Sequence, residues 1–284
     1  MTNASTLGFL VSRGEIVLPD PLKQLSAELF YRNPLRTGET KPAFGLGEAD
    51  PERSDHTGYQ ALILDGREKP TSLEREGFKL LQHSTMVEDF YNDQDVQSRY
   101  YAEIKEVALK QTGAAFAQVL SHITRSEEQA LSGQRLGAHR LVHNDFTPSL
   151  KQTLEPLLGQ YDIEKGRICV FNLWRRFDGD ALHAPLAVCD ASSVTDAELI
   201  PTDLHNYGGG EGFQVEIYQS SHNPGHRWFY FPKMHKKEVL MFKTYDSAMD
   251  PFMPTLHSAF DDPNCPEEVS LRESIEVRVM CFYV

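Results

Sequence analysis

The sequence is poor in cysteine and has no long apolar run. Its four cysteines, Cys169, Cys189, Cys265 and Cys281, are widely spaced and form no C-x-x-C pair, which argues against a disulfide framework and against a cysteine-based zinc site. We therefore expect reduced, mostly buried thiols. The longest early apolar run, residues 7–10, is too short for a signal-peptide core or a membrane span. These absences favour a soluble protein of the cytoplasm.

Positive charge is also scarce. Lysine and arginine total 28 residues against 41 aspartates and glutamates, which gives a formal net charge of -13. Binding to a nucleic-acid backbone needs concentrated lysine and arginine, so a nucleic-acid partner is not expected. The same reasoning argues against an anionic membrane surface. A small-molecule partner remains, and the oligomeric state stays open, with a homodimer as one option.

Several enzyme signatures are missing as well. The chain has no G-x-S-x-G elbow, which argues against an α/β-hydrolase. Residues 45–47 lack the third glycine of a dinucleotide-binding motif, and residues 208–212 lack the lysine of a phosphate-binding loop. His222 and His226 are four positions apart, but the Asn-Pro-Gly at 223–225 predicts a turn between them, not a zinc-binding helix.

The pattern along the chain predicts one domain, 1–284, of the α+β class. Residues 1–60 are rich in proline, glycine and charge and are expected to form an extended N-terminal arm. Residues 72–125 show apolar positions near helical spacing, which predicts supporting helices. Residues 139–284 contain short apolar or alternating runs separated by turn residues. The expected fold is a double-stranded β-helix (jelly roll) core with an N-terminal helical layer.

The expected elements can be placed more closely. Helices are predicted from residue 72 to about 81, over 95–110 and 116–123, and as a short segment over 152–160. Strands are predicted over 59–65, 140–147, 167–174, 186–190, 213–220, 228–231, 239–245 and 274–284.

The tripeptide His143-Asn144-Asp145 is the most informative motif. In a strand the side chains of His143 and Asp145 point to the same face. His257 follows 257 − 143 = 114 residues later and could complete two imidazoles and one carboxylate, the facial triad that holds Fe(II). Taken alone, an H-x-D tripeptide is more often an ordinary polar pair. His139 would lie roughly 13 Å from His143 along a strand, too far to share an ion.

The C-terminal strand separates apolar from polar side chains. One face carries Ile275, Val277, Val279 and Cys281, and the other carries Arg272, Ser274, Glu276 and Arg278. The polar face is either the exposed side of an edge strand or the lining of a barrel interior. In an interior, Arg272 could clamp a carboxylate bidentately and Ser274 could add a hydrogen bond.

The combination of H-x-D, a distal histidine and R-x-S resembles the Fe(II)/2-oxoglutarate-dependent dioxygenases. More narrowly, six stretches are similar to the mostly fungal hydroxylase/desaturase family: 142–148, 172–175, 185–190, 242–247, 256–261 and 272–278. That family includes a gibberellin desaturase and resembles the cephamycin 7-methoxylase component. The resemblance covers about residues 85–284, and its specificity comes from the combined order and spacing of the pieces.

The resemblance implies a ligand set and a reaction. His143, Asp145 and His257 would bind Fe(II), while Arg272 and Ser274 would bind the co-substrate 2-oxoglutarate. With oxygen, the enzyme would hydroxylate, desaturate or otherwise oxidise a small secondary metabolite, a natural-product intermediate, and release succinate and carbon dioxide.

Three further residues are candidates for binding the co-substrate. Arg278 lies on the same strand face as Arg272 and could compete with it for 2-oxoglutarate. Asn172 and Arg175 lie in a strand-like run around Trp174, where a structural ion pair beside a buried aromatic is an equally good interpretation. The sequence leaves these alternatives open.

Two other functions remain open. A zinc-dependent hydrolase or isomerase could use the same triad, although the R-x-S after the distal histidine argues against it. A non-catalytic jelly-roll binding subunit could have kept the fold, although the intact ligand set argues against that.

Overall fold

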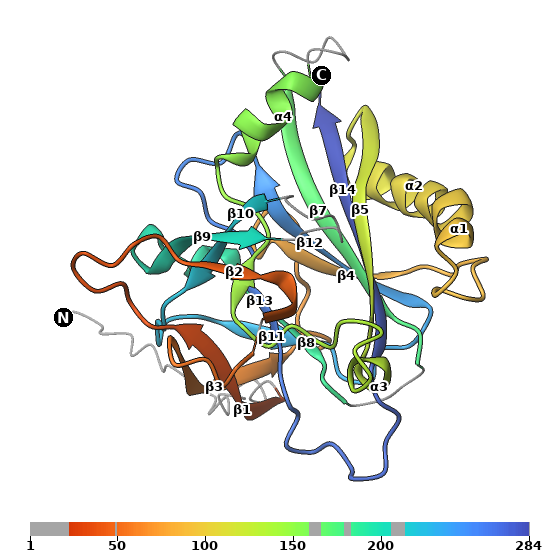
Figure 1. Cartoon of the computed structure of the whole chain (residues 1–284). Coiled ribbons are helices and arrows are strands. Elements are labelled where there is room, and N and C mark those ends of the chain that lie inside the picture. Colours follow the sequence, from red (N-terminus) through yellow and green to blue (C-terminus); the bar gives the residue numbers. More distant parts are fainter. Residues whose placement is uncertain (1–22, 49, 159–165, 179–182, 206–213, 284) are drawn as a thin grey trace, which may run out of the picture.

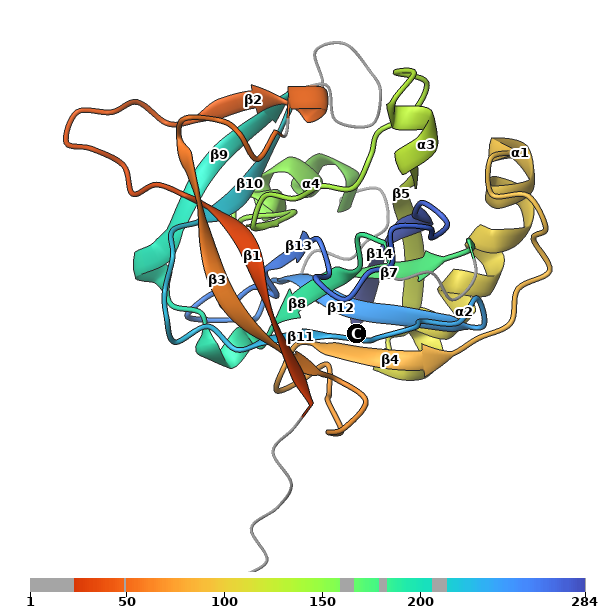
Figure 2. The same cartoon turned by 90° about the horizontal axis from the view of Figure 1, so that it is seen from below.

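The computed structural model describes residues 23–48, 50–158, 166–178, 183–205 and 214–283. Two β-sheets lie face to face, and short helices flank them (Figures 1 and 2). This is the expected jelly-roll core.

The first sheet has nine strands. Their order is β1 (Gln24–Arg32), β3 (His56–Asp65), β11 (Trp228–Tyr230), β8 (Leu186–Cys189), β13 (His257–Ala259), β6 (His143–Asn144), β10 (Gln214–Ser220), β9 (Leu199–His205) and β2 (Ala43–Gly45). Its neighbours pair antiparallel, except that β11 runs parallel to β3 and β2 runs parallel to β9. The sheet thus joins strands from both ends of the described chain.

The second sheet has five antiparallel strands. Their order is β4 (Phe78–Gln82), β12 (Glu238–Asp246), β7 (Arg167–Arg176), β14 (Glu273–Tyr283) and β5 (Phe116–Ser126). The helical segments are η1 (Leu46–Glu48), α1 (Asp93–Asp95), η2 (Val96–Tyr100), α2 (Tyr101–Thr112), α3 (Glu127–Ala130), α4 (Leu150–Leu158), η3 (Ala191–Ser193) and η4 (Asp196–Glu198). Among the described residues, no helix is long and apolar enough to cross a membrane.

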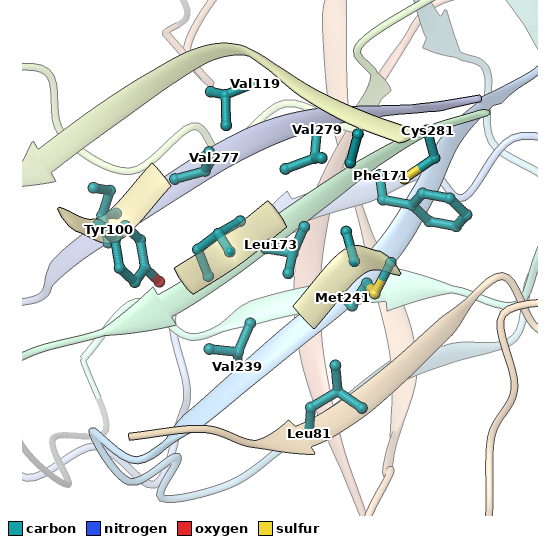
Figure 3. Packing of buried hydrophobic residues seen from close by; sticks show 14 of the residues in the cluster. Leu81, Tyr100, Val119, Phe171, Leu173, Val239, Met241, Val277, Val279 and Cys281 are labelled. Carbon is teal, nitrogen blue, oxygen red and sulfur yellow. The ribbon is translucent and has the colours of Figure 1, made fainter. Parts of the chain in front are cut away.

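The alternation along β14 decides which face of the five-stranded sheet is covered by α2. Four apolar side chains of β14 that share one face are fully buried in one cluster with Leu173 of β7, Met241 of β12 and Ile104 of α2 (Figure 3): Ile275, Val277, Val279 and Cys281. Burying such side chains contributes roughly 1.5–3 kcal/mol each. The polar side chains of β14 are therefore turned to the opposite face, toward the nine-stranded sheet. This confirms the interior-lining interpretation of that face.

Aromatic and aliphatic side chains from both sheets fill the space between them at one end. They are Phe78, Trp174, Leu186, Val188, Phe229, Phe231, Met234, Leu240 and Phe242. His257 and Arg272 contact this packed cluster through Phe242 and Trp174. A close-packed core gives such side chains a rigid support.

The structure corrects the expected helices before residue 125. The segment from Ser72 does not form a helix, because Gly77 adopts a φ of +87° and the chain then enters β4. Residues 116–123 belong to β5, where pairing with β14 overrides the local helical spacing. Only the helix expected over 95–110 is confirmed, within residues 93–112. The N-terminal helical layer is thus reduced to this one segment.

The expected N-terminal arm and the H-x-D strand also need correction. Residues 24–32 form β1, which pairs with β3 along its whole length, so this part of 1–60 is sheet; residues 1–22 lie outside the described part. The strand expected over 140–147 is only β6. The short helix expected over 152–160 is found as α4, and residues 159–160 and 208–212 are not among those described.

Candidate metal centre

Three side chains from the two sequence motifs converge between the sheets. One ligand atom from each of His143, Asp145 and His257 lies within 4.8 Å of the others. Asp145 Oδ1 lies 3.5 Å from His143 Nε2 and 3.7 Å from His257 Nε2. All three residues are buried. The predicted ligand set therefore forms one cluster, as a facial triad requires.

Neighbouring strands produce this convergence. His143 of β6 and His257 of β13 are register partners, and their ring centroids lie 4.2 Å apart. Asp145 directly follows β6, and its carboxylate lies beside the His143 ring. The long separation in sequence is closed by the pairing of two very short strands.

Each histidine is oriented by a carbonyl two residues before it. His143 Nδ1 lies 2.8 Å from the oxygen of Leu141, and His257 Nδ1 lies 3.2 Å from the oxygen of Thr255. A carbonyl can only accept, so each Nδ1 carries the proton and each Nε2 is left with a lone pair. Second-shell bonds of this kind fix the tautomer of metal-binding histidines. Both Nε2 atoms face Asp145.

Asp145 receives two hydrogen bonds on its other oxygen. Asn172 Nδ2 donates to Oδ2 at 2.7 Å, and Arg278 Nε donates at 2.6 Å. Burial alone would raise the pKa of Asp145, but the Arg278 cation lowers it well below its usual range. The carboxylate is therefore ionised at neutral pH and ready to bind a cation.

His139 lies much closer to the cluster than the sequence indicated. Its ring centroid is 4.1 Å from that of His143, and its Nε2 is buried without a hydrogen-bond partner among the described atoms. The expected separation of roughly 13 Å assumed a strand, but the chain before β6 bends instead. Burial, with His143 and Arg125 nearby, lowers the pKa of His139 well below its usual value. His139 is thus a neighbour of the site but contributes no ligand atom to the cluster, so only the expected distance was wrong.

Arg272 and Ser274 lie together on the polar side of β14. Arg272 Nε donates to Ser274 Oγ at 3.0 Å, and Nη1 donates to the oxygen of Ala184 at 3.0 Å. The guanidinium lies over the ring of Trp174, 5.0 Å from its centroid. Burial, together with Arg176 and Arg125, lowers the pKa of Arg272 to about 9. It remains charged at neutral pH, and among the described residues no carboxylate forms an ion pair with it.

The structure does not bring Arg175 to this cluster. It lies on the opposite face of β7 from Asn172, with Nη2 2.6 Å from His83 Nδ1 and its guanidinium over the ring of Tyr100. The sequence already contained the signal for this difference, because residues three positions apart on a strand lie on opposite faces. Thr244 was missed by sequence reasoning, although its hydroxyl donates to Asn172 Oδ1 at 3.2 Å.

The buried imidazole of His257 predicts a pH effect on the metal-free protein. Burial and His143 lower the pKa of His257 to about 3, whereas an unfolded chain protonates it near 6.5. Below about pH 6.5 the unfolded state binds a proton that the folded state does not, so the free energy of unfolding decreases as the pH is lowered. Between pH 7 and 5.5 we expect wild type to lose about 1 kcal/mol more than His257→Gln, measured by urea unfolding with chelator present. Equal losses in both proteins would contradict this.

Comparisons with known proteins identify relatives of this chain. A protein-family model described as an oxidoreductase/YMDC permease-like domain matches residues 29–282. The hydroxylase/desaturase efuI of Hormonema carpetanum is 30% identical over 75% of this chain and 79% of its own length. The Fe(II)/2-oxoglutarate-dependent dioxygenase nvfI of Aspergillus novofumigatus is 28% identical over 94% of this chain and 95% of its own.

A solved structure shows the same fold. The iron and alpha-ketoglutarate-dependent endoperoxidase NvfI superposes with a TM-score of 0.79 and 24% identity, covering 92% of this chain and 98% of that one. The narrower likeness to gibberellin desaturase and the cephamycin methoxylase component stays a prediction. The chain belongs to this oxidoreductase family and, within it, to the hydroxylase/desaturase group of Fe(II)/2-oxoglutarate-dependent dioxygenases, enzymes that use iron(II), 2-oxoglutarate and oxygen.

Proposed function

We propose that His143, Asp145 and His257 hold the iron of this enzyme. The observation that carries the proposal is the cluster of their ligand atoms, all within 4.8 Å of one another. Two neutral imidazoles and one ionised carboxylate match the donor set of a mononuclear Fe(II) site. Both histidines already have the tautomer that leaves Nε2 free to coordinate.

Arg272 and Ser274 would bind the carboxylate of 2-oxoglutarate that is remote from the metal. A buried guanidinium without a carboxylate partner among the described residues is costly, and a bound carboxylate would offset that cost. Ser274 Oγ and Ala184 O engage Nε and Nη1, which fixes the plane of the guanidinium. A fixed planar fork suits bidentate recognition of a carboxylate.

The substrate would be a small, largely apolar secondary metabolite. The ring of Phe242 lies 4.8 Å from that of His257, so the packed apolar cluster between the sheets reaches the metal ligands. Apolar walls exclude water and leave placement to shape. The names of the relatives, which include hydroxylase/desaturases and an aspirochlorine biosynthesis protein, support a role in making natural products.

Bound iron would supply the redox chemistry by which oxygen oxidises the substrate and 2-oxoglutarate. The chain's own residues would do the rest. His143, Asp145 and His257 hold the metal on one side, Arg272 aligns the co-substrate, and the interior keeps out water. Hydroxylation and desaturation would differ in how the substrate is placed.

We also propose that the whole chain is one domain that acts in the cytoplasm. Each sheet combines strands from distant parts of the chain, such as β1 with β13 and β4 with β14. Neither the N-terminal nor the C-terminal half of the chain contains all the strands of either sheet.

Turnover without substrate tests the proposed function. Purified protein with Fe(II), 2-oxoglutarate and oxygen is expected to release succinate slowly, and addition of the true substrate should raise the rate. Zn(II) in place of Fe(II) should give none, because zinc has no redox chemistry. Zinc-supported hydrolysis of a test substrate without succinate would instead favour the hydrolase alternative.

A further inference from the structure

The two oxygens of Asp145 have different surroundings. Oδ1 faces the histidines, at 3.5 Å from His143 Nε2 and 3.7 Å from His257 Nε2. Oδ2 faces the five-stranded sheet and accepts from Asn172 and Arg278, which are register partners on β7 and β14. One oxygen is thus presented to the metal position, and the other is engaged by protein.

Both donors to Oδ2 are themselves held in place. Arg278 Nη2 forms an ion pair with Glu276 Oε1 at 2.7 Å, so the guanidinium is fixed between two carboxylates. The Thr244 hydroxyl lies 3.2 Å from Asn172 Oδ1 and 3.3 Å from the Val170 oxygen. Its donation to Oδ1 leaves the amide nitrogen facing Asp145. Hydrogen bonds to a charged group are stronger than those between neutral groups. Rotating Asp145 to offer both oxygens would break two such bonds.

We infer that Arg278 and Asn172 are positioning residues that restrict Asp145 to coordination through one oxygen. The inference rests on the proposed iron site. A six-coordinate metal with three protein ligand atoms keeps about three open positions. If Asp145 chelated with both oxygens, about two would remain, too few for a chelating 2-oxoglutarate and for oxygen. The two donors would therefore keep open the third coordination position that the reaction needs.

This assignment differs from co-substrate binding by Arg278. Two of its nitrogens already pair with carboxylates, Nε with Asp145 and Nη2 with Glu276. Arg272, by contrast, forms no ion pair with a carboxylate of the described chain. The two arginines therefore have different roles: Arg272 would bind the co-substrate, and Arg278 acts through Asp145.

The test counts water ligands on Mn(II), which substitutes for Fe(II) without oxidising. Water-proton relaxation of the Mn(II)-loaded protein, without 2-oxoglutarate, is expected to give about three exchangeable waters in wild type and about two in Arg278→Met combined with Asn172→Ala. Because no co-substrate is present, direct binding to it cannot cause the change. Arg278→Lys, which keeps one donor and the charge, should restore the wild-type number. The surface variant Arg99→Met controls for loss of a cation.

Should that double variant fail to fold, Arg278→Met with Glu276→Gln removes the ion pair together and is expected to show the same loss of one water. An unchanged water number in a folded variant that carries Arg278→Met would overturn the inference. Failure of the proposed iron site looks different: His257→Ala would then bind Mn(II) as tightly as wild type.

Discussion

Replacing His257 by alanine is expected to abolish iron binding and turnover. The variant removes one of three ligand atoms from a cluster whose members are all buried. Loss of second-shell partners alone usually costs 10–100-fold in metal affinity, so loss of a ligand should cost more than about 100-fold. Anaerobic equilibrium dialysis with Fe(II) measures the affinity directly, and succinate release measures turnover.

His222→Ala is the matched control for that experiment. His222 stacks on Tyr59, with ring centroids 4.0 Å apart, and contributes no ligand atom to the cluster. It should bind Fe(II) as wild type does. Wild-type affinity in His257→Ala would mean that iron is held elsewhere.

Replacing Arg272 by methionine should weaken 2-oxoglutarate while leaving the metal bound. Truncating one partner of a buried charge pair costs about 2–5 kcal/mol, which corresponds to roughly 30- to several-thousand-fold in affinity. Arg272 forms no hydrogen bond or ion pair with the three metal-site residues, so Fe(II) affinity should change little. The KM for 2-oxoglutarate and the dissociation constant for Fe(II), measured on the same preparation, separate the two effects.

The reverse result would assign co-substrate binding to the other arginine. If Arg272→Met keeps the wild-type KM and Arg278→Met raises it strongly with the water number unchanged, Arg278 is the co-substrate residue. The surface variant Arg99→Met should change neither constant.

The period-two pattern of β14 was enough to predict its two faces correctly. Its alternate apolar positions from Ile275 to Cys281 pack in one cluster with α2, and Arg278 lies on the opposite face. Alternation along a strand predicts this without knowledge of the partner strands. The three members of the candidate metal site were also predictable from their residue types. What local pattern could not provide was the pairing of β6 with β13, which brings distant histidines together.

The errors arose where long-range contacts override local spacing. Residues 116–123 read as helical, yet they complete the sheet beside β14. His139 was judged too distant because a strand was assumed where the chain bends. The roles of Asn172 and Arg278 toward Asp145 depend on three segments meeting between two sheets, and spacing within one segment does not reveal such a contact.

One titration tests the central claim most directly. Anaerobic addition of 2-oxoglutarate to the Fe(II)-loaded protein is predicted to produce a visible metal-to-ligand charge-transfer band in wild type and none in His257→Ala. The band arises only when the co-substrate chelates iron, so it reports both partners at once. A wild-type protein that holds Fe(II) but shows no band at saturating 2-oxoglutarate would contradict the account.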